Sequence, residues 1–486
     1  MIKPTLDEAK ELAREYSLVP LALEIFSDQK TPIEILRNLS RKSEYCFILE
    51  SVNGSDSWGR YSFLGYKPVL NIYGTKDSVT VDYGVSKTEK KQDAVLAIKE
   101  LISKHKSPRI SYLPPFTGGF VGYFAYDFVQ HFIPGLTLCE KNENNFYDFH
   151  LMLIDKVIVF DHFKQKIYII VNISTEDIEN SYTNGAAELK NIENMLLEPL
   201  AHSGEETPVC GEFSQYFSEE AFKAMIGTVK SHIAEGDIFQ AVISNRFSAP
   251  YSGSLINTYR ILRTINPSPY MVYMRLHDME IACSSPETLV ALRNGRVNSF
   301  PLAGTCPRSE TSEEDAVLID ALLKDEKELA EHNMLVDLAR NDLGKISRFD
   351  SVKLCEYRQV KKFSHVCHIS SHITGELKES LDALDVIAAT LPAGTLSGAP
   401  KKRACEIINE VEGMKRGVYG GSIGYIDFAG NADMCIGIRM AVLKDGNVYV
   451  QSGAGIVADS VPEREYRETQ NKAGAIIEAL KKSGEV

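Results

Sequence analysis

Short apolar runs recur through the first 200 residues of the chain. Stretches rich in β-branched and aromatic residues lie at 60–66, 120–128, 149–160 and 166–173, and clusters of Gly, Asn, Asp and Lys separate them. This length and composition predict β-strands, and the short intervals between them favour largely antiparallel pairing. Shorter helical patterns fill some of the intervals.

The pattern changes after a polar segment at 200–215 that carries Gly and Pro. Long helical patterns then alternate with compact apolar runs, which predict strands at 241–247, 270–276, 279–285, 435–443 and 448–457. Because strands often follow each other without a helix between them, the pattern favours an α+β fold over a doubly wound parallel sheet. We expect large, mostly antiparallel sheets packed as a sandwich with covering helices. The polar segment predicts a linker between an N-terminal domain (1–200) and a second domain (215–486).

Composition narrows the classes of function. The 486 residues are 44% hydrophobic and 24% charged, an ordinary globular balance. The net charge is -13 and no block of five or more basic residues occurs, so we expect no nucleic-acid partner. No apolar segment approaches the roughly 18 residues that a membrane span needs, and nine dispersed cysteines without a CxxC pair suit reduced thiols. These features predict a soluble, cytoplasmic protein.

Two predicted helices each carry a pair of glutamates spaced three residues apart. Glu328 and Glu331 share one face of the helix around 324–344. Glu465 and Glu468 follow the same stripe as Lys472 on the last helix, and this spacing predicts that they point toward the buried side. Carboxylate oxygens are the ligands that Mg²⁺ prefers. On spacing alone, a magnesium site and a solvated acidic face both remain open.

Small-residue turns at 301–308, 391–403, 418–425 and 451–457 form a second group of candidates. Their exposed backbone N–H groups suit carboxylate or phosphate oxygens, but none matches a Walker A loop or a GxGxxG turn after a strand. His365, His368 and His372 have helical metal-site spacing, yet the β-branched residues around them favour a strand.

Long motifs in a fixed order give the chain a family resemblance. They are FILESVNGSDSWGRYSFLGY, INPSPYMVYM, CSSPE, PLAGT, ELAEHNMLVDLARNDLG, LPAGTLSGAPKKRACEII, GGSIGY, CIGIRMA and QSGAGIVADSVPEREYRET. Together they resemble the chorismate-utilising enzymes, and specifically the large subunits (component I) of anthranilate synthases. The resemblance covers essentially the whole chain. It implies that family's fold and a Mg²⁺-dependent conversion of chorismate and ammonia to anthranilate and pyruvate, the first committed step of tryptophan synthesis.

The resemblance also assigns roles to residues that match the family's motifs. Glu331 and Glu468 would bind Mg²⁺ directly, and Glu328 and Glu465 would act through its waters. His368 would transfer protons, with Thr395 beside it. The residues expected to hold chorismate are Gly304, Thr305, Tyr419, Arg439, Gly453, Ala454, Gly455 and Lys472.

Two positions separate the relatives. Enzymes that attack chorismate with water resemble this family but place a Lys base where this chain has Gln240, and a neutral amide is a poor base. Aminodeoxychorismate synthases often carry a nucleophilic Lys where this chain has Ala303. One departure from the family pattern is Cys306, where an Arg is usual. The alternatives are aminodeoxychorismate synthase component I and a catalytically silent tryptophan-binding subunit.

Regulation and partnership follow from the same resemblance. Residues that resemble the family's tryptophan feedback site are Leu49, Glu50, Ser51, Pro269, Tyr270 and Met271. On residue types alone they would be a strand end and a core turn. The chain has no glutaminase segment with a nucleophilic Cys in a Gly-rich elbow, so we expect ammonia to come from a separate glutamine amidotransferase subunit, component II.

Overall fold

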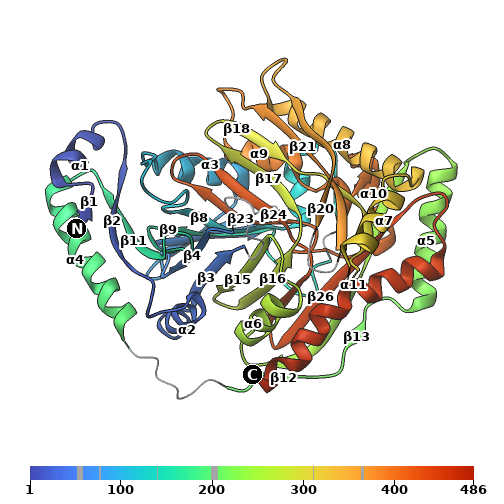
Figure 1. Ribbon diagram of the computed structural model, residues 1–486, viewed down its shortest axis with the longest axis horizontal. Helices are drawn as coiled ribbons and strands as arrows, with labels where there is room; N and C mark the ends of the chain where they lie inside the picture. The colour runs from blue at the N-terminus through green and yellow to red at the C-terminus, as the bar shows by residue number, and fades with distance from the viewer. Residues whose placement is uncertain (52–58, 76–77, 140, 199–205, 310, 363–365) are drawn as a thin grey trace.

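Two large antiparallel sheets lie face to face in the computed structural model (Figure 1). The structure describes residues 1–51, 59–75, 78–139, 141–198, 206–309, 311–362 and 366–486. Every strand pair among these residues is antiparallel. The predicted α+β class with antiparallel sheets is therefore confirmed.

The first sheet has 14 strands within the described residues. Their order is β1 (Ile2–Lys3), β2 (Leu18–Phe26), β11 (Lys166–Ser174), β10 (Lys156–Asp161), β4 (Tyr61–Tyr66), β3 (Tyr45–Glu50), β15 (Tyr270–Leu276), β16 (Met279–Ser285), β25 (Met440–Lys444), β26 (Asn447–Ile456), β14 (Gln240–Ser252) and β12 (Val209–Cys210). Two short strands, β13 (Ser214–Gln215) and β22 (Gly398–Ala399), also pair with β14.

The second sheet has 12 strands over the same described ranges. Their order is β19 (Leu302–Pro307), β21 (Val366–Glu376), β18 (Arg296–Ser299), β17 (Thr288–Arg293), β24 (Ala432–Ile436), β23 (Ser422–Asp427), β8 (Gly119–Phe124), β9 (Phe149–Ile154), β5 (Leu70–Thr75), β6 (Ser78–Asp82) and β7 (Lys87–Lys90), and β20 (Lys353–Lys362) pairs with β21. The main core lies between the two sheets. There Phe47 and Phe63 of the first sheet and Phe120, Leu151 and Ile423 of the second are all buried.

Helices cover the outer surfaces of this sandwich. They are α1 (Leu6–Leu12), α2 (Pro32–Lys42), α3 (Ala94–Lys104), α4 (Ile178–Leu197), α5 (Glu219–Ala234), α6 (Ile256–Ile265), α7 (Ser312–Leu322), α8 (Glu326–Ile346), α9 (Ala383–Thr390), α10 (Lys401–Glu412) and α11 (Pro462–Lys482), with 3₁₀ turns η1 (Tyr126–His131), η2 (Gly394–Leu396) and η3 (Ser483–Glu485). Helices α2, α4, α6 and α11 share a second apolar cluster with the first sheet. Helices α8 and α9 pack on the second. No helix in the described part of the chain is long and apolar enough to cross a membrane.

The strand predicted at 435–443 is wrong, because the chain changes sheets within it. Strand β24 ends at Ile436 in the second sheet, and β25 begins at Met440 in the first. Arg439 lies in this crossing with a φ of 52°, in the left-handed region that non-glycine residues seldom adopt. The apolar run reads as one strand in sequence since both of its halves are buried.

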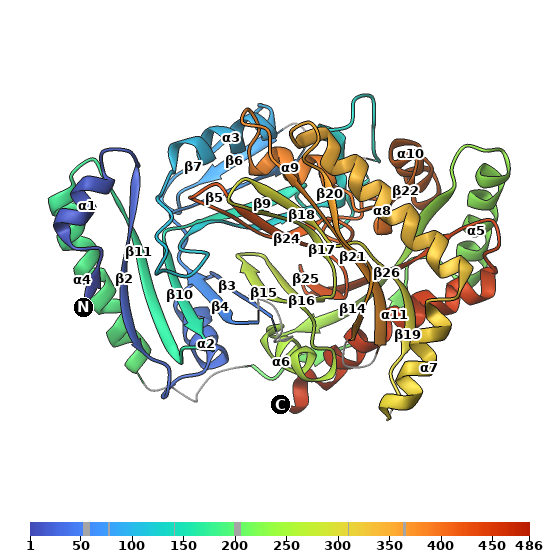
Figure 2. The ribbon, with the colours of Figure 1, turned by 45° about the horizontal axis from the view of Figure 1, so that its top comes forward.

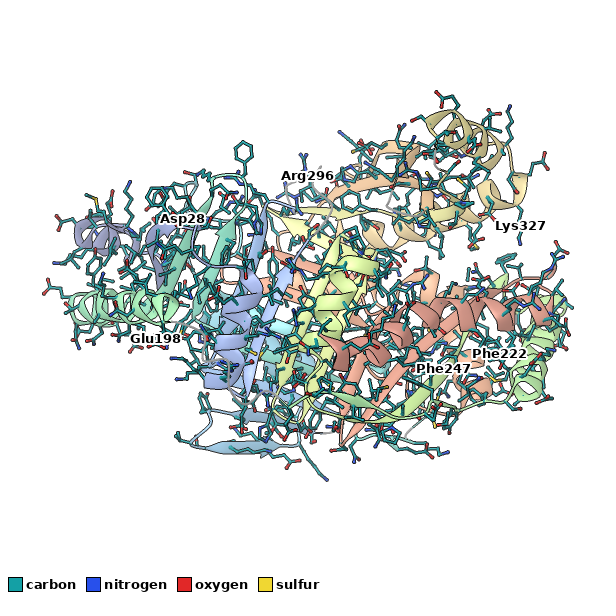
Figure 3. The ribbon with its side chains drawn as sticks, turned by 60° about the horizontal axis from the view of Figure 1, so that its bottom comes forward. Asp28, Glu198, Phe222, Phe247, Arg296 and Lys327 are labelled. Carbon is teal, nitrogen blue, oxygen red and sulfur yellow. The ribbon has the colours of Figure 1, made fainter. Side chains whose placement is uncertain are left out.

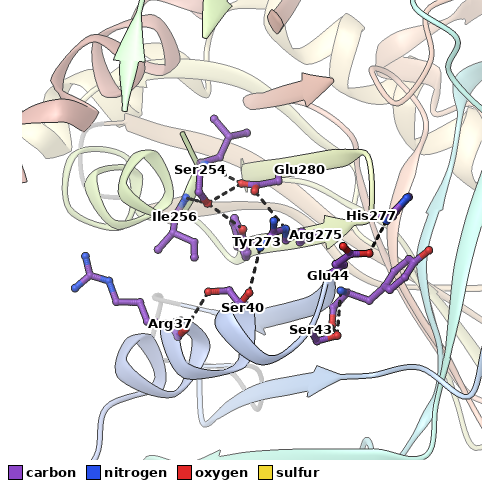
Figure 4. Close-up of polar contacts among 12 residues, drawn as sticks. Arg37, Ser40, Ser43, Glu44, Ser254, Ile256, Tyr273, Arg275, His277 and Glu280 are labelled. Carbon is purple, nitrogen blue, oxygen red and sulfur yellow. Dashed lines mark hydrogen bonds and ion pairs between the residues drawn. The ribbon is translucent and has the colours of Figure 1, made fainter. Parts of the chain in front are cut away.

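Both sheets combine strands from the two sides of the predicted linker. Strand β3 pairs with β15, and β8 pairs with β23. Polar contacts fasten the hairpin of β15 and β16 to two helices (Figure 4): Arg275 Nη1 donates to the Ser40 carbonyl of α2 at 3.1 Å, and Glu280 accepts at 2.8 Å from the hydroxyl of Ser254, just before α6. The division into 1–200 and 215–486 stays a prediction, and part of 200–215 lies outside the described residues.

Candidate active site

Two helices carry the predicted glutamate pairs and lie opposite each other. Asp325 caps the start of α8 by accepting from the backbone N–H groups of Lys327 and Glu328. Figure 3 shows Lys327 at this end of α8, above the ribbon of α11. Burial, together with the charges of Glu328 and Glu468, raises the pKa of Glu331. Carboxylates from both helices therefore act on one another.

The prediction that both glutamates of α11 point to the buried side is wrong for Glu468. Its side chain is 47% exposed and pairs with Lys472 Nζ at 2.5 Å. Glu465 is half-buried, and burial raises its pKa. The buried stripe of α11 runs through Thr469, Ala473, Ile476 and Leu480. In the first half of the helix it lies one residue beyond Glu468 and Lys472, and a shift of one residue turns a helix face by about 100°. Glu468 therefore faces away from the buried stripe, but its charge still acts on Glu331 of α8.

Two cations, Lys472 and Arg439, meet at the middle of α11. Lys472 Nζ donates to the Gly453 carbonyl at 3.1 Å, and Arg439 Nη1 donates to the Lys472 carbonyl at 2.7 Å. A Cβ atom at Gly453 would lie 2.9 Å from the Tyr419 hydroxyl and 2.6 Å from a backbone oxygen of β14, so only glycine fits there. The structure thus gathers four of the residues expected to hold chorismate, and two of them are cations suited to carboxylates.

His368 lies on β21 directly opposite Thr305 of β19, so the strand expected around it is confirmed. Its Nδ1 is 3.0 Å from the Thr305 hydroxyl and 3.1 Å from the Gly304 carbonyl. Burial, and to a lesser degree the charge of Arg439, lowers the pKa of His368, so the imidazole is neutral near pH 7. Gly304 has a φ of 70° at a β-bulge, a conformation that favours glycine. His365 lies outside the described residues.

Sequence reasoning missed Glu287, which lies between β16 and β17. Burial raises the pKa of this carboxyl to about 7, although a hydrogen bond from Thr395 and the charge of Lys472 act against the rise. The Thr395 hydroxyl donates to it at 3.1 Å from η2. Glu287 and Thr395 line a cavity of about 50 Å³. The available signal was a lone acidic residue between two apolar strands, within the CSSPE motif that carried the resemblance.

Gln240 begins β14 and is only 4% exposed. Its Oε1 has no hydrogen-bond partner within the described part of the chain. A Cβ atom at Gly455 would lie 2.6 Å from Gln240 Nε2, so the small residue makes room for the amide. A buried acceptor without a partner costs free energy. This arrangement suits a carbonyl that receives a hydrogen bond from a ligand.

A second cavity lies between the two sheets. Leu49, Glu50, Tyr270 and Met271 line it, together with Tyr61, Phe63, Val272, Ile423, Gly424, Tyr425 and Asp433. Ser51 and Pro269 adjoin these residues in sequence but do not line the cavity.

Polar contacts around this second cavity neutralise the Glu50 carboxylate and connect Tyr270 to a residue that lines the first cavity. Glu50 pairs with Arg263 Nε at 2.5 Å and accepts from the Tyr259 hydroxyl at 2.6 Å. The Tyr270 hydroxyl lies 2.9 Å from the hydroxyl of Thr288, which lines the first cavity beside Glu287.

Comparisons with known proteins identify the family of the chain. A family model described as chorismate binding enzyme matches residues 44–478. The anthranilate synthase component 1 of Acetivibrio thermocellus is 43% identical, over 100% of both chains. The crystal structure of anthranilate synthase component I from Streptococcus pneumoniae has a TM-score of 0.78 and 36% identity, covering 93% of this chain and 98% of that one.

A more distant neighbour shows the fold alone. The menaquinone-specific isochorismate synthase of Escherichia coli has a TM-score of 0.72 with 19% identity, and the match covers 98% of each chain. The full-length matches at about 40% identity, rather than this distant neighbour, decide the family. The chain therefore belongs to the chorismate-binding enzymes, and within them to the anthranilate synthase component 1 proteins.

Proposed function

We propose that the chain converts chorismate and ammonia to anthranilate and pyruvate in a Mg²⁺-dependent reaction. One observation carries the proposal: a carboxyl that stays partly protonated near pH 7, Glu287, lies within electrostatic range of Lys472. A protonated acid beside cations can bind an anionic substrate and still supply a proton to a leaving group.

In the first half of the reaction, the ring hydroxyl of chorismate leaves as ammonia adds to the ring. Glu287 donates the proton with which the hydroxyl departs as water, and Thr395 holds this carboxyl in place. The Gln240 carbonyl accepts a hydrogen bond from the incoming ammonia. Because a neutral amide is a poor base, Gln240 does not activate water in its place.

In the second half, the ring loses a proton and the enolpyruvyl group leaves as pyruvate, which makes the ring aromatic. His368 is the base. A hydrogen bond from its Nδ1–H to the Gly304 carbonyl makes Nε2 the basic nitrogen, and its lowered pKa keeps the imidazole neutral before the transfer. Arg439 and Lys472 hold the substrate carboxylates.

The carboxylates of α8 and α11 fit a Mg²⁺ ion by their chemistry. Burial and mutual repulsion raise the pKa values of Glu331 and Glu465, and a hard cation would relieve both effects. No three of the four carboxylates gather within 4.8 Å, so the substrate carboxylate would complete the set. Glu331 and Glu468 would hold the ion directly, and Glu328 and Glu465 through water. Bound Mg²⁺ would supply positive charge that orients the substrate and assists loss of the hydroxyl.

The test is anthranilate fluorescence from the purified chain with chorismate, Mg²⁺ and an ammonium salt. We expect a signal that EDTA removes and added Mg²⁺ restores. Chorismate consumption without release of pyruvate would instead identify an aminodeoxychorismate synthase, which retains the enolpyruvyl side chain. Binding of tryptophan with no turnover would identify a silent subunit.

We also propose that tryptophan binds the second cavity and inhibits the reaction. The cavity has aromatic walls that suit an indole, and an entering ammonium would compete with Arg263 for the Glu50 carboxylate. Ser51 adjoins the cavity at the end of β3, and the hydrogen bond between the Tyr270 and Thr288 hydroxyls links the cavity to the residues beside Glu287. Substitution Ser51→Phe should relieve inhibition at unchanged uninhibited rate, while Ser86→Phe, at an exposed position outside the cavity, should not. Equal inhibition of Ser51→Phe and wild type would refute this site.

We propose a glutamine amidotransferase subunit as the partner that supplies ammonia, as the name component 1 of the relatives suggests. The isolated chain should then use ammonium but not glutamine. Glutamine-dependent anthranilate formation by the isolated chain, at the rate seen with ammonium, would refute the partnership. Nine free cysteines are consistent with a reducing cytoplasm.

A further inference from the structure

Two cysteines face each other beside the proposed active site. In the ladder between β19 and β21, Cys306 lies directly opposite Cys367. Both thiols are free, and they are buried at 7% and 0% exposure in a small apolar cluster that includes Leu322 of α7 and Ile369. Figure 2 shows β19 next to α7 at one end of the second sheet.

The ladder already provides the spacing of a disulfide. Directly opposite residues of an antiparallel pair have Cα atoms about 4.5 to 5.5 Å apart, and disulfides span about 4.4 to 6.8 Å between Cα atoms. Burial raises the pKa of the Cys306 thiol, and its interaction with the Cys367 thiol raises it further. The two sulfur atoms are therefore neighbours without any movement of the strands.

The next pair along the same ladder is Thr305 and His368. Because successive side chains of a strand point to opposite faces, the thiols lie on the face away from Thr305 and His368. This agrees with burial, since Thr305 is exposed and both cysteines are buried. A covalent bond between the strands at this position constrains the backbone that carries the proposed base.

We propose that Cys306 and Cys367 form a site of reversible two-electron oxidation, at which a disulfide slows turnover by constraining His368. The effect on turnover rests on the proposed function; formation of the disulfide does not. With a small-molecule disulfide as oxidant, the two protein thiols give up two electrons and two protons. One S–S bond forms in the protein, the S–S bond of the oxidant breaks, and two small-molecule thiols leave.

A second pair of thiols provides an internal comparison. Cys283 of β16 and Cys435 of β24 also interact, but both are completely buried between the two sheets. Cys306 instead retains some exposure, and the adjoining pair of Pro307 and Val366 is the last of its ladder. Strand ends open more readily than strand centres. Oxidation should therefore occur at Cys306 and Cys367 first.

The experiment oxidises the full chain with oxidised glutathione and maps disulfides by mass spectrometry. We expect a loss of two hydrogen atoms and a peptide that joins Cys306 to Cys367. We expect kcat for anthranilate formation from ammonium to fall at least tenfold, and dithiothreitol to restore it. Cys306→Ser and Cys367→Ser should each keep the reduced wild-type rate and resist the oxidant, whereas Cys355→Ser, which removes an exposed thiol, should behave as wild type.

Several results would overturn the proposal. Absence of the joining peptide after complete oxidation refutes the site. A joined peptide with unchanged kcat refutes the link to His368. Loss of activity in oxidised Cys306→Ser assigns the effect to another thiol. If the reduced enzyme makes no anthranilate, the proposed function fails, while peptide mapping still decides whether the disulfide forms.

Discussion

Replacing Glu287 by Gln should remove most of the activity and at the same time stabilise the fold. The change keeps the size of the side chain and its contact with Thr395 but removes the transferable proton. A carboxyl with the ordinary pKa of 4.5 would be about 0.3% protonated at pH 7, whereas a pKa of about 7 leaves about half of it protonated. General acids of this kind contribute about 10²- to 10⁴-fold to rate, so we expect kcat to fall by that factor.

The effect on stability has a defined sign. The pKa of Glu287 is raised in the folded state, so the folded protein binds more protons than the unfolded chain between about pH 4.5 and 7. Wild-type stability therefore falls as pH rises through this window, by at most about 3 kcal/mol. Glu287→Gln has no carboxyl to ionise and therefore does not lose this stability. Its free energy of unfolding should equal that of wild type at pH 4 and exceed it by the full difference at pH 8.

Two assays test these expectations. Anthranilate formation is measured at a fixed concentration of free ammonia across pH, because ammonium itself titrates; urea unfolding is measured at pH 5 and pH 8. Glu287→Asp, which keeps an acid but shortens its reach, should retain more activity than Gln. A Glu287→Gln enzyme with wild-type kcat would refute the role as proton donor. An identical pH dependence of stability in both proteins would refute the argument from burial.

Two further predictions follow from the same site. Glu331→Gln should weaken Mg²⁺ binding at least tenfold in calorimetric titration, because it removes a carboxylate whose repulsion by Glu328 and Glu468 a cation would relieve. The control variant Glu478→Gln, near the C-terminal end of α11, should bind Mg²⁺ as wild type does. Gly453→Ala should raise the KM for chorismate at least tenfold, since the new Cβ would lie 2.9 Å from the Tyr419 hydroxyl, whereas Gly474→Ala meets no atom within 4 Å and should leave steady-state kinetics unchanged.

Sequence patterns predicted the architecture better than the directions of side chains. Apolar runs predicted the strands around residues 241–247 and 270–285, because each run lies within a single sheet. The run at 435–443 misled since both of its halves are buried in different sheets. Glu468 misled because it shares a helical stripe with Ile476 and Leu480, which are buried, whereas the first half of the helix buries Thr469 and Ala473 instead.

The site residues were predicted from motifs, and a motif does not show which of its residues has a shifted pKa. Nothing in the spacing of CSSPE distinguishes Glu287 from a surface carboxylate; burial beside η2 does. Glu50 was predicted to lie in a tryptophan site, but the pattern could not reveal that Arg263, more than 200 residues away in sequence, already pairs with it. Long-range charge pairs of this kind depend on the tertiary fold.

The pairing of β3 with β15 and of β8 with β23 has a consequence for how the protein is made. During synthesis, the first 200 residues leave the ribosome before their neighbours in either sheet exist. Their open strand edges are surfaces on which chains aggregate. Pairing of strands that are far apart in sequence is slow, because the long intervening loop loses conformational entropy before the strands gain any stabilising contact. Production of active protein should therefore depend on chaperones and low temperature more than on the stability of the finished fold.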